Sequence, residues 1–163
     1  MDFRFAPMTL ADAHVVAEWH YEGLYAVCDW EEEPEMLGDF LIWPHLYCSV
    51  RDEGNELVGF AQLARLQRDT DTLSLVWGLR PDLVDKRHGL AFVEACLTYA
   101  QATYTPLRFT LGAWAFNQRA LHVYEQVGFR TVRIFNSGTR FGVLEFVEMV
   151  REESSLKPSL HYS

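Results

Sequence analysis

The sequence has few cysteines, no long apolar run and almost no basic residues in its first third. Its 163 residues include only Cys28, Cys48 and Cys96, an odd number in a chain that shows no signal peptide. We therefore expect reduced thiols and a cytoplasmic location. No apolar run approaches the roughly 18 residues that a membrane span needs, so no membrane partner is expected.

Lys and Arg are absent between Arg4 and Arg51. Nine acidic residues lie in that interval: Asp12, Glu18, Glu22, Asp29, Glu31, Glu32, Glu33, Glu35 and Asp39. Their nine negative charges equal the net charge of −9, so acidic and basic residues balance over the rest of the chain. An acidic chain of this kind is a poor nucleic-acid binder, which would need a basic face.

Other signatures are missing too. The His, Cys and Asp spacings do not resemble a metal site, so no metal is expected. The chain has no Gly-x-Gly-x-x-Gly and too few strand–helix repeats for a dinucleotide-binding fold. We find no internal repeat or linker. The length and a hydrophobic fraction of 49% predict one domain over residues 1–152, followed by a polar tail over 153–163.

Hydrophobic periodicity predicts an α/β domain with the order βααβββαβαββ. The first helix begins with Thr9 as its N-cap and carries an apolar stripe as far as Leu24. The expected strands are 3–8, 47–50, 57–66, a run from Leu73, 107–113, 130–135 and 140–150, and the other helices are a short one after Pro34, 89–103 and 117–126. A turn is expected at residues 136–138, and Gly128 should end the last helix.

The stretch from Leu73 to Ala91 suggests an anion site. An apolar strand is followed by a turn, a basic loop at Lys86, Arg87 and His88, and the start of a helix at Gly89. The first turn of a helix has unpaired N–H groups and a partial positive charge, which hold anions. The added basic residues favour a pyrophosphate, although without further support such a loop is more often a solvated turn.

Two blocks carry a resemblance to the GNAT superfamily of N-acetyltransferases. KRHGLA, residues 86–91, resembles the superfamily's acyl-CoA pyrophosphate signature, Gln/Arg-x-x-Gly-x-Gly/Ala. NQRALHVYEQVGF, residues 117–129, resembles its Asn-x-x-Ala-x-x-x-Tyr-x-x-x-Gly-Phe run. Arg87 stands where Gly is frequent and Asp85 adds a negative charge, and both departures could weaken cofactor binding.

The resemblance implies a single-domain fold with a central mixed, mostly antiparallel sheet flanked by helices. It implies an N-acetyltransferase that moves an acetyl group directly from acetyl-CoA to a primary amine. It places the cofactor on these residues: Trp77, Gly78, Leu79, Lys86, Arg87, His88, Gly89, Leu90, Ala91 and Asn117. Asn117 could equally serve only as a helix N-cap. Homodimers are common in the superfamily, so a homodimer is also an expectation.

Catalysis would need three more groups. A backbone N–H between Val76 and Gly78 could stabilise the thioester oxygen. Tyr124 occupies the place of the proton donor to the leaving thiolate, although by default it is a core aromatic residue. A base must deprotonate the amine, and the candidates are Glu22, Asp29 and Glu145. Glu22 is preferred because it would lie between Tyr21 and Tyr25 on the first helix.

The acidic first third favours a cationic acceptor, either a small molecule or a peptide amine, because carboxylates attract cations. The simpler interpretation of Glu31 to Glu33 is a solvated loop. Cys96 is expected to pack rather than react. The rival function is a non-catalytic acyl-CoA-binding regulatory domain, which would keep the basic loop but would not need Tyr124.

Overall fold

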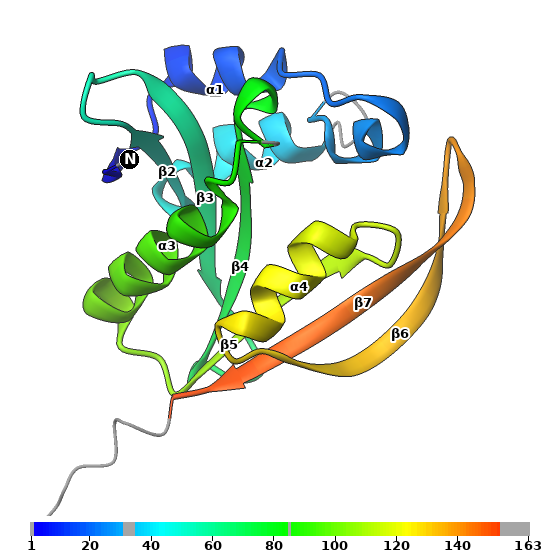
Figure 1. Cartoon of the computed structure of the whole chain (residues 1–163). Coiled ribbons are helices and arrows are strands. Elements are labelled where there is room, and N and C mark those ends of the chain that lie inside the picture. The colour runs from blue at the N-terminus through cyan, green and yellow to red at the C-terminus, as the bar shows by residue number, and fades with distance from the viewer. Residues whose placement is uncertain (1, 31–34, 85, 154–163) are drawn as a thin grey trace, which may run out of the picture.

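The computed structural model describes residues 2–30, 35–84 and 86–153 (Figure 1). The strands are β1 (Arg4–Pro7), β2 (Tyr47–Arg51), β3 (Leu57–Arg65), β4 (Thr72–Leu79), β5 (Arg108–Trp114), β6 (Arg130–Thr139) and β7 (Gly142–Glu152). The α-helices are α1 (Leu10–Ala17), α2 (Glu35–Ile42), α3 (Gly89–Tyr104) and α4 (Gln118–Gln126), and the 3-10 helices are η1 (Gly23–Cys28), η2 (Pro44–Leu46) and η3 (Pro81–Leu83). The predicted order of strands and α-helices is confirmed.

All seven strands form one sheet in the order β1-β2-β3-β4-β5-β7-β6. β4 and β5 run parallel, and the other neighbouring pairs are antiparallel. The predicted mixed, mostly antiparallel sheet is therefore confirmed. The helix α3 supplies the long crossover that a parallel pair requires, because two parallel strands cannot be joined by a hairpin.

Helices cover both faces of the sheet. Neighbouring residues of a strand point to opposite faces. On β3, Phe60 packs in a core cluster with Val16 of α1 and Phe40 of α2. The next residue, Ala61, belongs to a cluster that includes residues of α3 and α4. Figure 1 shows α3 and α4 as neighbours, away from α1 and α2.

Two helix starts follow their sequence signals. The Thr9 hydroxyl accepts the Asp12 N–H at 3.1 Å and caps α1. The Asn117 side chain accepts the Ala120 N–H at 3.2 Å and caps α4. Gly128 has φ of +100° directly after the last helix, as expected for a helix-ending glycine.

The first helix is shorter than predicted, because α1 ends at Ala17. The backbone N–H of Tyr21 donates to the Asp29 carboxylate at 2.9 Å instead of to a carbonyl one turn back. Gly23, at φ of +59°, then begins η1. Glu22 therefore does not lie on the first helix, and the reason given for preferring it as the base was wrong.

The turn predicted at residues 136–138 was also wrong. These residues belong to β6, where Asn136 pairs with Glu145 and Gly138 pairs with Val143. The chain reverses after Thr139, whose hydroxyl accepts the Phe141 N–H and donates to the Gly142 carbonyl. Gly142 takes φ of +102°. The turn at Thr139 closes the hairpin. The strand β6 is therefore longer than the turn predicted around Gly138 implied.

The sheet opens between β4 and β5. The two strands pair only from Thr72 to Ser74 on β4 and from Arg108 to Thr110 on β5. Beyond that point β4 stays with β3 and β5 stays with β7. The carboxyl ends of the two parallel strands therefore separate, and α4 follows the end of β5 (Figure 1).

Some sequence predictions lie outside the described residues. They concern the acidic run Glu31 to Glu33, the charge of Asp85 and the tail from residue 154 onward. The division into a domain of residues 1–152 and a tail stays a prediction.

Candidate active site

A cleft of about 1250 Å³ lies where β4 and β5 have separated. Its walls come from the segment 20–28, the end of β4, the start of α3 and one face of α4. Eight predicted site residues line it: Glu22, Trp77, Gly78, Leu79, Lys86, Gly89, Asn117 and Tyr124. Residues more than 100 positions apart in sequence therefore share one cavity.

Four other predicted residues, Arg87, His88, Leu90 and Ala91, are not among those that line the cleft. The side chains of Leu90 and Ala91 are exposed, so these residues could contribute only backbone N–H groups to a ligand. Arg87 is exposed and adopts φ of +62°, a left-handed conformation that turns the basic loop into the helix.

The start of α3 has the form of an anion site. His88 is the N-cap residue, and no side chain caps the helix there. The first helical hydrogen bond runs from the Phe92 N–H to the His88 carbonyl at 2.9 Å, so the amides of Gly89, Leu90 and Ala91 precede the helical ladder. A Cβ at Gly89 would meet nothing closer than Val123 at 3.9 Å. The packing of the protein therefore does not require glycine at this position. A ligand bound closely against the backbone would require it, because a Cβ would then be in the way.

Tyr124 projects from α4 toward β4. Its hydroxyl accepts the indole N–H of Trp77 at 3.0 Å, and its side chain is buried. Burial raises the pKa of Tyr124 to about 12, against a smaller lowering by the Trp77 hydrogen bond. Because Trp77 donates, the phenol proton stays available for another acceptor. Tyr124 is thus held as a protonated donor where the strands separate.

The end of β4 is held by Tyr21. The Tyr21 hydroxyl donates to the Leu79 carbonyl at 2.5 Å, and burial raises the pKa of Tyr21. A Cβ at Gly78 would lie 2.8 Å from Phe60 and 3.2 Å from the Tyr21 hydroxyl. Gly78 is therefore needed for this close approach of Tyr21 to the strand.

The three proposed bases have different surroundings. Glu22 is exposed on the cleft wall as the residue before η1. Asp29 is 4% exposed and accepts the Tyr21 N–H, so it holds the loop together. Glu145 is exposed on β7 and is not among the residues that line the cleft. Of the three, only Glu22 faces the cavity.

One part of the cleft wall is aromatic. Tyr25 of η1 packs edge-to-face on Phe116 with ring centroids 5.3 Å apart. The Arg119 guanidinium lies 4.8 Å from the centre of the Tyr25 ring. Such a wall suits the hydrocarbon part of a ligand.

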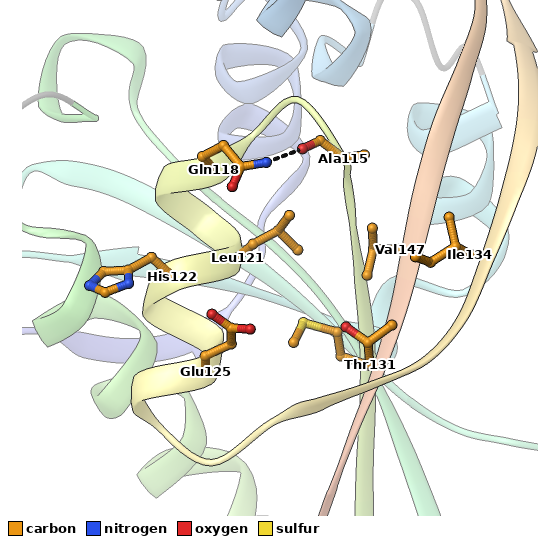
Figure 2. Close-up of a pocket in the computed structure, with 9 residues that line it drawn as sticks. Ala115, Gln118, Leu121, His122, Glu125, Thr131, Ile134 and Val147 are labelled. Carbon is orange, nitrogen blue, oxygen red and sulfur yellow. Dashed lines mark hydrogen bonds between the residues drawn. The ribbon is translucent and has the colours of Figure 1, made fainter.

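The other face of α4 borders a smaller cavity of about 320 Å³ against β6 and β7. Figure 2 shows Leu121 and Glu125 on the side of Val147 and Thr131, whereas the His122 ring points away from these strands. Gln118 donates to the Ala115 carbonyl at the end of β5. The two cavities share no residue, so α4 separates them.

Sequence comparison agrees with the geometry. Residues 2–130 match the family described as the acetyltransferase (GNAT) domain. The chain belongs to the GNAT acetyltransferase family. This GNAT domain is accordingly an enzyme of the N-acetyltransferase class, as predicted, in a family that uses acetyl-CoA as co-substrate. No curated protein matches the sequence.

Solved structures share the fold of this GNAT domain at low identity. A chimera of the Vibrio cholerae spermidine N-acetyltransferase SpeG with hSSAT has 16% identity and a TM-score of 0.76, over 95% of this chain and 98% of its own. A mutant form of SpeG, a spermidine/spermine N-acetyltransferase of Vibrio cholerae, has 14% identity and a TM-score of 0.74, over 94% and 96%. A dodecameric spermidine N-acetyltransferase from Vibrio cholerae has 14% identity and a TM-score of 0.73, over 94% of this chain and 95% of its own.

Sequence reasoning missed several residues of the GNAT cleft. They are His20, Tyr21, Tyr25, Cys28, Phe116 and Arg119. The sequence HYEGLY, residues 20–25, has the aromatic and ionisable composition of a binding wall, but the predicted continuous helix concealed it. Only the fold brings this segment opposite Trp77 and Tyr124.

Two other kinds of feature are absent from the described part of the chain. Within residues 2–30, 35–84 and 86–153, no group of three or more His, Cys, Asp or Glu could hold a metal ion. Over the same residues no helix is long and apolar enough to cross a membrane.

Proposed function

We propose that this GNAT domain transfers an acetyl group directly from acetyl-CoA to a primary amine of a cationic acceptor. The observation that carries the proposal is the Tyr124 hydroxyl, held by the Trp77 N–H at 3.0 Å inside the opening between β4 and β5. A thioester supplies an activated acetyl group, and its thiolate needs a proton when it leaves. The raised pKa of Tyr124 and its place on the cleft wall support it as that proton donor.

The residues of the chain fit acetyl-CoA at both ends of the cleft. Lys86 and the first-turn amides of α3 would hold the pyrophosphate, since they combine a positive charge with N–H groups that precede the helical ladder. The backbone from Trp77 to Leu79, no longer paired with β5, would bind the pantetheine arm as an added strand. An N–H between Val76 and Gly78 would stabilise the thioester oxygen. Asn117 caps α4 and lines the cleft, so capping and cofactor contact are compatible.

Several acidic residues of the first third bind partners within the protein, so fewer of them support a cationic acceptor than the sequence suggested. Asp12 pairs with Arg51, Asp29 holds the loop, and Asp39 accepts from Tyr47 at 2.8 Å and from Gln62 at 2.9 Å. Glu22 remains on the cleft wall beside Tyr21 and Tyr25. The structural neighbours named as spermidine acetyltransferases support a polyamine as the first acceptor to try.

A panel of amines tests the proposal. Purified protein is incubated with acetyl-CoA and spermidine, spermine, putrescine, a lysine peptide or an aromatic primary amine that is uncharged at neutral pH, and N-acetylated product is measured by mass spectrometry alongside CoA thiol release. We expect product with at least one polyamine and less with the uncharged amine. Absence of product from every amine, despite saturable acetyl-CoA binding, would favour the non-catalytic binding domain.

A cytoplasmic location and a homodimer stay predictions. The described residues contain Cys28, Cys48 and Cys96 without a disulfide. One structural neighbour is described as a dodecamer, so the oligomeric state is open to direct measurement by light scattering.

A further inference from the structure

A hydrogen-bonded pair outside the two GNAT sequence blocks joins His20, in the loop between α1 and η1, to Asp29, the residue that follows η1. The Nδ1 atom of His20 lies 3.1 Å from Oδ2 of Asp29. The His20 side chain is 59% exposed and the Asp29 side chain only 6%. The second oxygen of Asp29 accepts the backbone N–H of Tyr21 at 2.9 Å. A buried carboxylate thus orients an exposed imidazole.

The pairing determines the tautomer of the ring. A carboxylate is ionised near neutral pH and only accepts hydrogen bonds, so Nδ1 of His20 carries a proton. The lone pair of the neutral ring is then on Nε2. The negative charge of Asp29 also stabilises the imidazolium that forms when Nε2 takes up a proton.

His20 borders the candidate active-site cleft. His20 lines the same cavity as Trp77 and Tyr124. The residue that follows it, Tyr21, donates to the Leu79 carbonyl at the end of β4. The loop that carries His20 is therefore fastened to the strand end on which the thioester would bind.

We propose that His20, oriented by Asp29, is the general base that removes a proton from the acceptor ammonium. This inference rests on the proposed acetyl transfer and names the base for it. Imidazole is a stronger base than a solvated carboxylate by about two pKa units, so it is better matched to an amine near neutral pH. The role replaces the one expected of Glu22.

Two residues, His20 and Tyr124, account for all the proton transfers of the reaction. His20 accepts one proton from the ammonium, and the nitrogen lone pair then forms the C–N bond to the acetyl carbon. The C–S bond breaks with its electron pair on sulfur, and Tyr124 donates its proton to that thiolate. Tyr124 regains the second proton that the nitrogen loses, and His20 releases its proton to solvent. One proton is released for each acetyl group transferred.

Other groups around the cleft also titrate or carry charge, and any pH profile includes them. Besides Asp29, they are Tyr21, Glu22, Tyr25, Cys28, Asp82, Lys86, Arg119 and Tyr124. A single pH-dependent rate cannot separate them, so the test compares variants rather than one profile.

The test is the pH dependence of kcat/KM for His20→Gln, measured on the best amine of the panel. We expect a loss of about 100-fold near pH 7, in line with general-base catalysis. The loss should shrink as the pH approaches about 10, because the aliphatic amine then arrives without its extra proton. Acetyl-CoA affinity and the thermal midpoint should be unchanged, since the His20 side chain is exposed.

Two further variants sharpen the result. Asp29→Asn keeps an acceptor for the Tyr21 N–H but removes the charge that supports the imidazolium, so it should show a smaller loss with the same pH trend. His14→Gln is the matched control, because His14 is an exposed histidine of α1 that is not among the residues lining the cleft. It should behave as wild type.

The results that would contradict the role of His20 differ from those that would contradict the proposed function. A wild-type pH profile in folded His20→Gln would overturn the role of His20, and a loss of the acid limb in Glu22→Gln alone would give it to Glu22. Failure of the wild-type protein to acetylate any amine would overturn the proposed function itself, and the base with it.

Discussion

The two sides of the cleft differ in whether their residues belong to recognisable sequence motifs. On the side that we propose for the cofactor, Lys86, Gly89 and Tyr124 come from two short sequence blocks and offer a helix start, backbone amides and one fixed phenol. On the side that we propose for the acceptor, His20 and Tyr25 come from a loop and a 3-10 helix without a motif. Backbone geometry leaves a sequence signature, whereas a wall of loop side chains does not.

The largest expected effect tests the cofactor side. Tyr124→Phe keeps the buried ring but removes the proton donor and leaves the Trp77 N–H without its acceptor. We expect kcat to fall about 100-fold, at the lower end of general-acid effects, with acetyl-CoA affinity unchanged. Steady-state kinetics and calorimetry together check this. Equal turnover by Tyr124→Phe and wild type would contradict the role of the phenol and favour a solvent donor.

Gly78→Ala tests the contact between the two sides. The new Cβ would lie 2.8 Å from Phe60 and 3.2 Å from the Tyr21 hydroxyl, so the strand end and the loop must shift. We expect a loss of about 2 kcal/mol in the free energy of unfolding, as in other overpacked sites, together with weaker acetyl-CoA binding. Chemical denaturation measures the first and calorimetry the second.

Gly138→Ala provides the matched control, because a Cβ there meets nothing within 4 Å. Its stability and its affinity should stay at wild-type values. If both glycine variants lost the same stability, the close approach of Tyr21 to β4 would not explain the effect.

Asp12→Asn tests whether the acidic residues of the first third all serve the acceptor. Asp12 is buried and accepts both Arg51 N–H groups at 2.9 Å and the Ser49 hydroxyl at 2.7 Å. We expect a loss of about 1–2 kcal/mol in unfolding free energy, because charged hydrogen bonds are weakened, with no change in the KM of the amine. A raised KM without destabilisation would give Asp12 a part in acceptor binding.

The same variant predicts a pH effect. The hydrogen bond from Arg51 holds the pKa of Asp12 below its ordinary value of 3.8. The stabilisation is therefore complete above that ordinary value and is lost as the pH falls below it, through the pKa of the folded state. Thermal midpoints of wild type and Asp12→Asn should converge in that acidic range and differ most near neutral pH.

Salt gives the smallest expected effect. Glu18 and Glu22 are exposed acids of the first third, and charges in solvent are screened at physiological ionic strength. We expect the KM of a polyamine to rise by about two- to threefold between low salt and 0.5 M salt, whereas the KM of an uncharged amine stays constant. A polyamine KM that ignores salt would contradict the attraction of a cationic acceptor.

The sequence predicted the fold well because its signals are local. The caps at Thr9 and Asn117, the strand from Leu73 and the two blocks around Gly89 and Tyr124 each depend on neighbours in the chain. The element order followed from these signals. The opening between β4 and β5 depends on pairing across the sheet, which no local signal specifies.

The acceptor side could not be predicted in the same way. The periodicity of residues 10–24 continued past the true end of α1, because Trp19 is buried although it no longer lies on the helix. Past the end of α1, the hydrogen bond from the Tyr21 N–H to Asp29 joins residues eight positions apart. Nothing in the spacing of His20 and Asp29 distinguishes an oriented imidazole from two solvated side chains.

Acetyl-CoA binding at the start of α3 is the most direct requirement of the proposed acetyl transfer. The decisive measurement is calorimetric titration of acetyl-CoA, and then CoA, into wild type and the Lys86→Ala, Arg87→Ala double variant. We predict saturable one-site binding to wild type that is weakened about tenfold or more in the variant, since Lys86 at the proposed pyrophosphate site and the neighbouring charge of Arg87 are lost. Equal affinity of both proteins, or no binding to wild type, would contradict it.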